Sequence, residues 1–184
     1  MTTQRLGPIA LDAMTPEQRR VADALISGPR GAVRGPFPAL LRRPELADCA
    51  RAMGDCIRAT SSLPLPLREI AILTTARHWD ASYEWGAHVK IAREIGMDMG
   101  VVETIKARHR PDSADAETLL VYDFTTQALQ NHDIADETYA RALARFGEAG
   151  IVDLIGIVGY FSFACMIFNL TRMPPNDPAD QLTA

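Results

Sequence analysis

Apolar residues recur along this chain with a helical period, and no segment alternates convincingly as a strand does. The longest interruption is the Gly- and Pro-rich stretch 28–38, which we expect to be a loop bearing Arg30 and Arg34. Helices are expected at about 15–27, 45–61, 67–77, 81–95, 98–108, 116–131, 136–147 and 151–169. The pattern therefore predicts an all-α protein of about seven to eight helices.

Residues that start helices stand at several of these boundaries. Thr15 is expected to cap the first helix, with Pro16 at the first helical position and Gln18 completing a capping box. The other expected N-caps are Asp80 or Ser82 before a helix closed by Gly96, Ser113 or Asp115 before 116–131, and Asp136 before a helix that ends at Gly147.

The segment 151–169 is nearly apolar throughout and is long enough to cross a bilayer. However, Asp153 lies inside it, Gly156 and Gly159 suit close helix packing, and no Lys/Arg cluster flanks it. We therefore expect a buried core or subunit-interface helix and no membrane partner.

Length and charge limit the possible classes of protein. The 184 residues predict one helical domain at 15–172, with an N-terminal arm at 1–14 and a C-terminal tail at 173–184. A net charge of −4 without a basic stripe argues against a nucleic-acid partner. The three cysteines show no metal-ligand spacing, and no signal pattern opens the chain, so a cytoplasmic protein without metal or cofactor is expected.

The side chains best suited to proton chemistry are Glu69, Glu84 and His88. Glu84 and His88 are four residues apart, which places them on one helix face. Glu69 precedes an Ile70–Leu73 run that is apolar on nearly every side, so its helix is expected to be buried. The alternatives are an exposed Glu84–His88 pair and a Glu69 paired with a nearby arginine.

Several segments together resemble the carboxymuconolactone decarboxylase family, whose fold is shared with AhpD-type alkylhydroperoxidases. They are 34–37 (RGPF), 43–46 (RPEL), 67–73 (LREIAIL), 83–85 (YEW) with His88, and the stretch from Glu148 through 152–156 (VDLIG) and 159–161 (GYF) to Asn169. The resemblance implies an AhpD-like all-α fold and a homo-oligomer, usually a trimer or hexamer.

The resemblance also separates two chemistries. The peroxidase branch has a Cys-x-x-Cys-x-x-x-His pattern with a Glu twelve residues before the first Cys. Glu69 and His88 match that Glu and His, but Ala81 and Glu84 occupy the cysteine positions. Without those thiols, peroxide reduction by a dithiol has no nucleophile there. The resemblance therefore implies the decarboxylase-like branch.

The expected function is cofactor-free acid–base catalysis on a small carboxylated lactone or ring acid. His88 would donate or accept a proton, since its ordinary pKa suits exchange near neutrality. Glu84 would be its partner or a second acid–base group, Glu69 would orient His88 or relay protons, and Arg34 would bind a substrate carboxylate. Other expected binding residues are Phe37, His78, Tyr83 and Trp85. The alternatives are an AhpD-like peroxidase and a non-catalytic oligomeric binding module.

Overall fold

The computed structural model describes residues 3–112 and 114–182, which form eight α-helices and two short 3-10 helices, with no strand among them. The prediction of an all-α protein is confirmed. The helices are α1 (Pro16–Ser27), α2 (Phe37–Leu40), α3 (Pro44–Thr60), α4 (Leu65–His78), α5 (Ser82–Glu94), α6 (Met99–Lys106), α7 (Ala116–Asn131) and α8 (Asp136–Thr171), with η1 (Leu11–Ala13) and η2 (Pro178–Asp180) near the ends.

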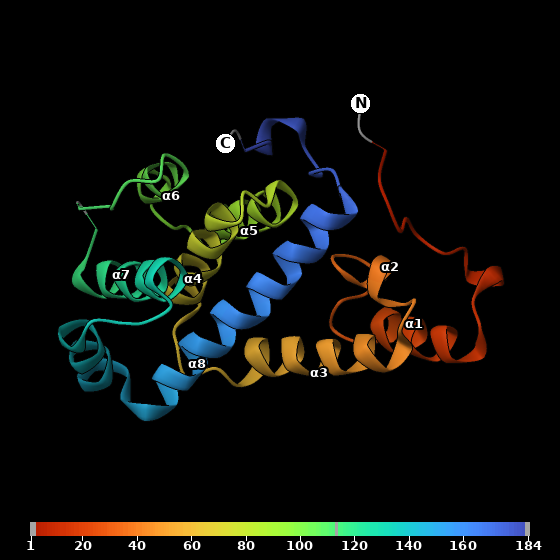
Figure 1. Ribbon diagram of the computed structural model, residues 1–184, viewed down its shortest axis with the longest axis horizontal. Coiled ribbons are helices and arrows are strands. Elements are labelled where there is room, and N and C mark those ends of the chain that lie inside the picture. Colours follow the sequence, from red (N-terminus) through yellow and green to blue (C-terminus); the bar gives the residue numbers. More distant parts are fainter. Residues whose placement is uncertain (1–2, 113, 183–184) are drawn as a thin grey trace.

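Helix α4 is the centre of the core. It packs against α5, α6, α7 and α8, and every residue from Glu69 to Arg77 is buried. A helix that is apolar on nearly all sides can bury its apolar side chains only where other helices surround it. In Figure 1, α8 runs diagonally across the molecule, with α4 to α7 on one side of it and α1 to α3 on the other.

The predicted caps at Thr15 and Asp115 are confirmed. The Gln18 backbone N–H donates to Thr15 Oγ1 at 3.3 Å, and the Thr15 N–H donates to the Gln18 side chain at 3.0 Å, which is a complete capping box. Asp115 accepts backbone hydrogen bonds at the start of α7, while Ser113 lies outside the described residues.

The predicted caps before α5 are wrong, because other partners bind both side chains. Ala81 is the N-cap and makes no side-chain hydrogen bond. Asp80 instead has a left-handed backbone (φ 50°) and pairs with Arg77 and Arg108. Charge-assisted hydrogen bonds to two guanidiniums thus replace a cap that would contribute about 1 kcal/mol.

Ser82, the other expected cap, binds the C-terminal segment. Its hydroxyl accepts hydrogen bonds from the Leu182 backbone N–H at 3.0 Å and from Gln181 Nε2 at 2.9 Å. Asp180 lies so close to Gly86 that a Cβ there would approach its carboxylate to 2.3 Å. The chain before residue 183 therefore lies directly against α5, on a site that only glycine leaves open.

Helix α8 continues through the break expected at 147–150. Gly147 alone departs from helical geometry (φ 68°, ψ 179°), so two predicted helices form one kinked helix. Ala135, not Asp136, is its N-cap, and no side chain caps it. Within the described residues α8 alone has the length and apolar composition to cross a bilayer, and half of its most apolar stretch is buried in the protein.

Exposed apolar residues form a stripe along α8, which we call the outer stripe: Val152, Ile155, Gly159, Met166 and Leu170. Val152 is 66% exposed, Ile155 57% and Leu170 69%. The opposite face of α8 is buried, with Leu154, Ile157 and Phe161 in the core. The outer stripe is therefore an apolar face of α8 that no other part of the described chain covers.

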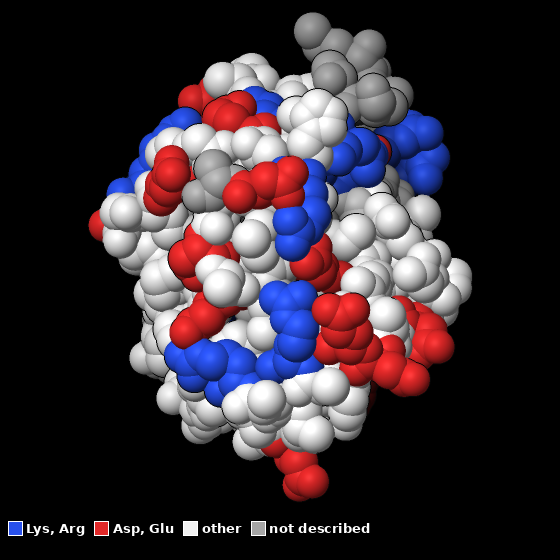
Figure 2. All heavy atoms as spheres, turned by 90° about the vertical axis from the view of Figure 1, so that its left-hand side faces the viewer, with Lys and Arg blue, Asp and Glu red and all other residues white. Residues whose placement is uncertain are grey.

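Charges of both signs are interspersed on the face that Figure 2 shows, which is the side of the molecule where α7 lies in Figure 1. Several ion pairs involve α7, among them Arg110 with Asp123 at 2.7 Å and Arg145 with Glu117 at 2.6 Å. Exposed pairs of this kind contribute about 0–1 kcal/mol each.

Candidate active site

An imidazole lies between two carboxylates at the contact of α4 and α5. His88 Nδ1 is 2.6 Å from Glu69 Oε2, and His88 Nε2 is 3.4 Å from Glu84 Oε1. The three residues are only 3–7% exposed. The structure thus brings together the three residues for which acid–base roles were predicted.

The two helices meet at this point because a tight turn joins them. The Ala81 N–H donates to the Ala76 carbonyl at 2.9 Å, which closes the end of α4 onto the start of α5. Asn169 Nδ2 donates to the Trp79 carbonyl at 2.6 Å and ties the turn to α8. With this turn fixed, the face of α5 that bears Glu84 and His88 is directed at α4.

The two carboxylates determine the charge of His88. Burial alone would lower the pKa of its imidazole, but the charges of Glu69 and Glu84 and the hydrogen bonds to them outweigh burial and raise that pKa from 6.5 to about 9. His88 is therefore an imidazolium at neutral pH. Such a group begins a reaction as a proton donor.

A cavity of about 430 Å³, which we call the main cavity, opens in front of this cluster. His88 and Glu84 line it, together with Phe161, whose ring meets the imidazole edge to face at a centroid distance of 5.2 Å. Glu69 is not among the described residues of the lining. The imidazole therefore presents Nε2 to the cavity, while Glu69 holds Nδ1 from behind.

Arginines line another part of the cavity wall. Arg30, Arg34 and Arg58 all border the cavity. Arg30 lies 4.6 Å above the Phe37 ring, and its Nη2 donates to the Tyr160 hydroxyl at 3.4 Å. Burial and the charge of Arg58 lower the pKa of Arg30. Asp55 also borders the cavity and pairs with Arg30 at 3.7 Å, which leaves more guanidiniums than carboxylates on this wall. The wall therefore suits an anionic group of a ligand.

Arg30 and Tyr160 were not among the predicted site residues. A Cβ at Gly54 would come within 2.5 Å of the Tyr160 hydroxyl and 2.7 Å of Arg30 Nη2, so the small residue on α3 makes room for both. The Gly/Pro-rich loop before α2 bears Arg30, so the sequence offered an indication of that residue. Tyr160 lies on α8 and reaches the cavity through tertiary packing alone.

The remaining predicted binding residues divide into two groups. Arg34 and Tyr83 line the cavity, and the Tyr83 hydroxyl accepts a hydrogen bond from the Gly35 N–H at 3.3 Å. Phe37, Trp85 and His78 lie outside its lining. Phe37 and Trp85 are fully buried in the core.

His78 lies on the other side of α4 from Glu69. The two residues are nine positions apart, which is two and a half turns, so their side chains leave the helix on opposite faces. His78 borders a different, smaller cavity beside α7.

No cysteine is among the described residues that line the cavity. Cys165 is buried on α8, where burial and the charge of Glu84 raise the pKa of its thiol. Cys49 and Cys56 are exposed on α3. Across residues 3–112 and 114–182, no group of three His, Cys, Asp or Glu side chains has an arrangement suited to a metal ion.

The raised pKa of His88 predicts that the protein loses stability as the pH rises. The folded pKa of about 9 exceeds the ordinary value of 6.5, so the stabilisation is fully present below pH 6.5 and is lost as the pH passes through about 9. Urea unfolding between pH 6 and 10 is expected to show a falling free energy of unfolding across this window.

His88→Gln removes the titrating group and is expected to flatten that part of the pH dependence. The difference between the two curves isolates His88 from other groups that titrate in the same range. Parallel curves for the two proteins would show that His88 has no raised pKa.

Two solved structures share this fold. A protein from Ralstonia eutropha JMP134, described as an alkylhydroperoxidase AhpD core and an uncharacterized peroxidase-related protein, aligns with a TM-score of 0.78 and 19% identity over 96% of this chain and 94% of that one. An uncharacterized peroxidase-related protein from Silicibacter sp. TM1040 aligns with a TM-score of 0.75 and 19% identity over 96% and 95%. No family model matches the sequence, and no curated protein matches it. The likeness to these structures shows that the chain has an AhpD-like fold.

Proposed function

We propose that this protein is an acid–base enzyme that decarboxylates, or otherwise moves a proton on, a small carboxylated lactone or ring acid. The supporting observation is the buried imidazolium whose Nε2 faces a cavity beside Glu84. The resemblance to carboxymuconolactone decarboxylases suggests the substrate class, since a fold alone does not define a reaction.

The three residues take different parts in this proposal. Glu69 contacts His88 but does not line the cavity, so it is a positioning residue that fixes the ring and maintains its positive charge. His88 and Glu84 are the catalytic residues, because both border the space where a substrate would lie. No bound metal or cofactor takes part in the proposed step.

In the decarboxylation step, the bond between a ring carbon and its carboxylate breaks and CO2 leaves. The electron pair is delocalised into the conjugated lactone carbonyl of the substrate. His88 Nε2 then donates its proton to the ring carbon that has lost its carboxylate. The imidazole regains a proton from water. Proton donation by a positioned side chain contributes about 10²–10⁴-fold to rate.

The arginines suit a group other than the departing carboxylate. An arginine that paired with the departing group would stabilise the reactant more than the transition state and would slow the step. We therefore assign Arg30 and Arg34 to a second carboxylate or to the lactone oxygen that gains charge. The departing carboxylate would then lie toward the apolar wall formed by Phe161, Ile91 and Ala164.

Turnover of unsaturated γ-lactone acids tests this proposal. The full chain is incubated with a panel of such compounds in D2O, and CO2 release and deuterium incorporation are followed by mass spectrometry. His88→Gln is expected to lower turnover by about 100-fold or more, and Glu84→Gln to lower it similarly. Glu103→Gln, an exposed carboxylate on α6, is the control and should retain full turnover.

The AhpD-like peroxidase remains the alternative, because both structural neighbours are described as peroxidase-related. Ala81 and Glu84, which stand at the two expected cysteine positions, are buried and have no thiol. Peroxide consumption that disappears when the three cysteines are replaced would support the alternative. No CO2 release from any lactone acid would overturn the decarboxylase proposal.

We also propose that the protein is a homo-oligomer, a trimer or hexamer, assembled through the outer stripe of α8. The support is the exposed apolar face at Val152, Ile155 and Leu170, on a part of α8 whose opposite face is buried in the core. Contiguous exposed apolar surface of this kind is typical of protein–protein contacts.

A further inference from the structure

Two tyrosine hydroxyls border the main cavity, that of Tyr83 from α5 and that of Tyr160 from α8. Tyr160 is only 4% exposed, and its hydroxyl oxygen accepts a hydrogen bond from Arg30 Nη2 at 3.4 Å. The proton of the same hydroxyl has no acceptor within residues 3–112 and 114–182. A buried hydroxyl whose proton is not used by the protein is available to a molecule in the cavity.

Tyr83 is the less suitable donor of the two. Its hydroxyl accepts from the neutral Gly35 backbone N–H at 3.3 Å, and its side chain is half-buried, so water can accept its proton. The Tyr160 hydroxyl accepts from a guanidinium instead. Hydrogen bonds in a chain polarise one another, and those from a charged donor do so most strongly. The positive charge of Arg30 therefore makes the Tyr160 hydroxyl the stronger donor.

The packing around Tyr160 fixes the position of its hydroxyl. A Cβ at Gly54 would lie 2.5 Å from the hydroxyl oxygen and 2.8 Å from Cζ, so α3 packs directly against the end of the ring. Arg30 is fixed as well, since it lies 4.6 Å above the Phe37 ring and 3.7 Å from Asp55. A donor that is already in place stabilises developing charge without the cost of moving into position.

Tyr160 and His88 are near enough to act on one small molecule. Both rings contact Phe161 edge to face, each with a centroid distance of 5.2 Å. The Phe161 ring belongs to the apolar wall toward which the departing carboxylate was placed above. A small ring that lies against this wall therefore has the His88 imidazolium and the Tyr160 hydroxyl as neighbouring donors.

We propose, on the basis of the reaction proposed above, that Tyr160 is a further catalytic residue that binds the enolate oxygen of the substrate. As CO2 leaves, the electron pair of the broken carbon–carbon bond moves into the lactone carbonyl, whose oxygen becomes negative. Tyr160 donates a hydrogen bond to this oxygen and keeps its own proton. The negative charge disappears when His88 Nε2 protonates the ring carbon. Arg30 is a positioning residue that acts on the enolate oxygen through Tyr160.

Binding of tetronate tests this assignment without turnover. Tetronic acid is a lactone whose enol is ionised at neutral pH, so it carries a stable enolate oxygen. Titration calorimetry on the full chain at pH 7 is expected to show saturable binding of tetronate. Tyr160→Phe should weaken this binding by about tenfold or more, because hydrogen bonds to charged groups contribute more than neutral ones.

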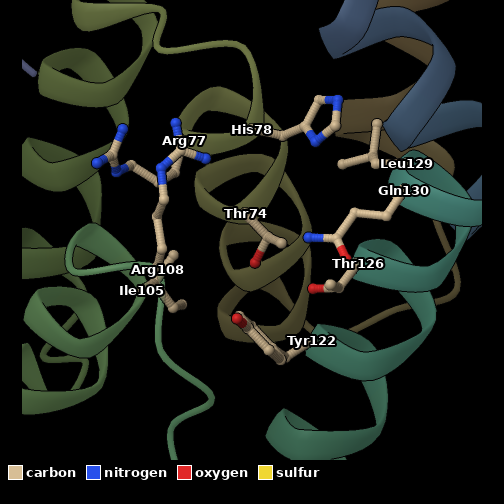
Figure 3. A pocket seen from close by; sticks show the side chains of 9 residues that line it. All are labelled: Thr74, Arg77, His78, Ile105, Arg108, Tyr122, Thr126, Leu129 and Gln130. Carbon is tan, nitrogen blue, oxygen red and sulfur yellow. The ribbon is translucent and has the colours of Figure 1, made fainter. Parts of the chain in front are cut away.

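Tyr122→Phe is the matched control, because it removes the same hydroxyl from a buried tyrosine outside the main cavity. Tyr122 lies on α7 and borders the smaller cavity beside that helix, together with Thr74 and Thr126 (Figure 3). Its replacement should change tetronate affinity by less than about twofold. Tyr83→Phe, which removes the other hydroxyl of the main cavity, should weaken binding less than Tyr160→Phe does.

Arg30→Gln tests whether Arg30 acts through Tyr160. The substitution should weaken tetronate binding in the unmodified protein. It should weaken binding several-fold less in the Tyr160→Phe background, because the hydroxyl that Arg30 polarises is absent there. An Arg30 that only supports the fold would give the same loss in both backgrounds, and this result would overturn its positioning role.

Turnover of the lactone acids distinguishes a failure of the Tyr160 assignment from a failure of the proposed reaction. Tyr160→Phe should lower kcat by about 100-fold and change KM little, because the enolate charge develops only in the transition state. CO2 release at the full rate by Tyr160→Phe would overturn the assignment and leave the reaction standing. Tetronate binding that depends on Tyr160 in a protein that releases no CO2 would support the enolate site and reject the reaction.

Two binding results would also overturn the assignment. One is the absence of saturable tetronate binding by the unmodified protein. The other is a loss of affinity in Tyr160→Phe that is no larger than the loss in Tyr122→Phe or Tyr83→Phe. Circular dichroism verifies that each variant is folded.

Discussion

Replacing His88 by leucine is expected to lower the free energy of unfolding by about 3–5 kcal/mol at pH 7. The imidazolium is the cation between Glu69 and Glu84, at 2.6 and 3.4 Å, and all three groups are buried. Leucine fills a similar volume but leaves two carboxylates without a counter-charge. Urea unfolding monitored by circular dichroism measures the loss.

His109→Leu is the control, because His109 is exposed and should change stability by about 0.5 kcal/mol or less. A triple variant that adds Glu69→Gln and Glu84→Gln to His88→Leu should regain part of the loss, since the uncompensated charges are removed. Stability of His88→Leu within about 1 kcal/mol of His109→Leu would contradict the buried charge cluster.

Ile155→Glu is expected to convert the proposed oligomer into monomers. Ile155 lies in the middle of the outer stripe and is 57% exposed in the single chain. In an assembled contact, each subunit would bury a carboxylate in an apolar surface, which costs several kcal/mol per site. Analytical ultracentrifugation over a range of protein concentrations measures the change in mass.

Leu46→Glu provides the comparison, because Leu46 is an exposed apolar residue of α3 outside the stripe and its replacement should leave the mass unchanged. The folded state of the Ile155→Glu monomer should be retained, as its side chain does not enter the core. A wild-type protein that sediments as a monomer at high concentration would contradict the proposed assembly.

Local sequence patterns were sufficient where short-range interactions decide the structure. Thr15 and Asp115 cap their helices as expected, because a cap depends only on the next few residues. The helical spacing of Glu84 and His88 placed both on one face of α5. The position of Glu69 beside them required the packing of α4 on α5, which the family resemblance implied and local periodicity did not.

Tertiary packing overrode sequence patterns elsewhere. Asp80 and Ser82 are good N-caps in isolation, yet two arginines and the C-terminal segment bind them instead. Trp85 is adjacent to Glu84 in sequence, but the next helical position turns it into the core. Tyr160 enters the main cavity from a segment far away along the chain, so no spacing rule could have found it.

The separation of Glu69 from the main cavity has a consequence for how this site could diversify. Glu69 fixes one side of the imidazole from the rear, so of the three acid–base residues only His88 and Glu84 meet an incoming molecule. Reactivity can therefore change through a substitution at position 84 alone, while the rear support and the helices around it stay as they are. A scaffold divided in this way is suited to acquiring new chemistry in small steps.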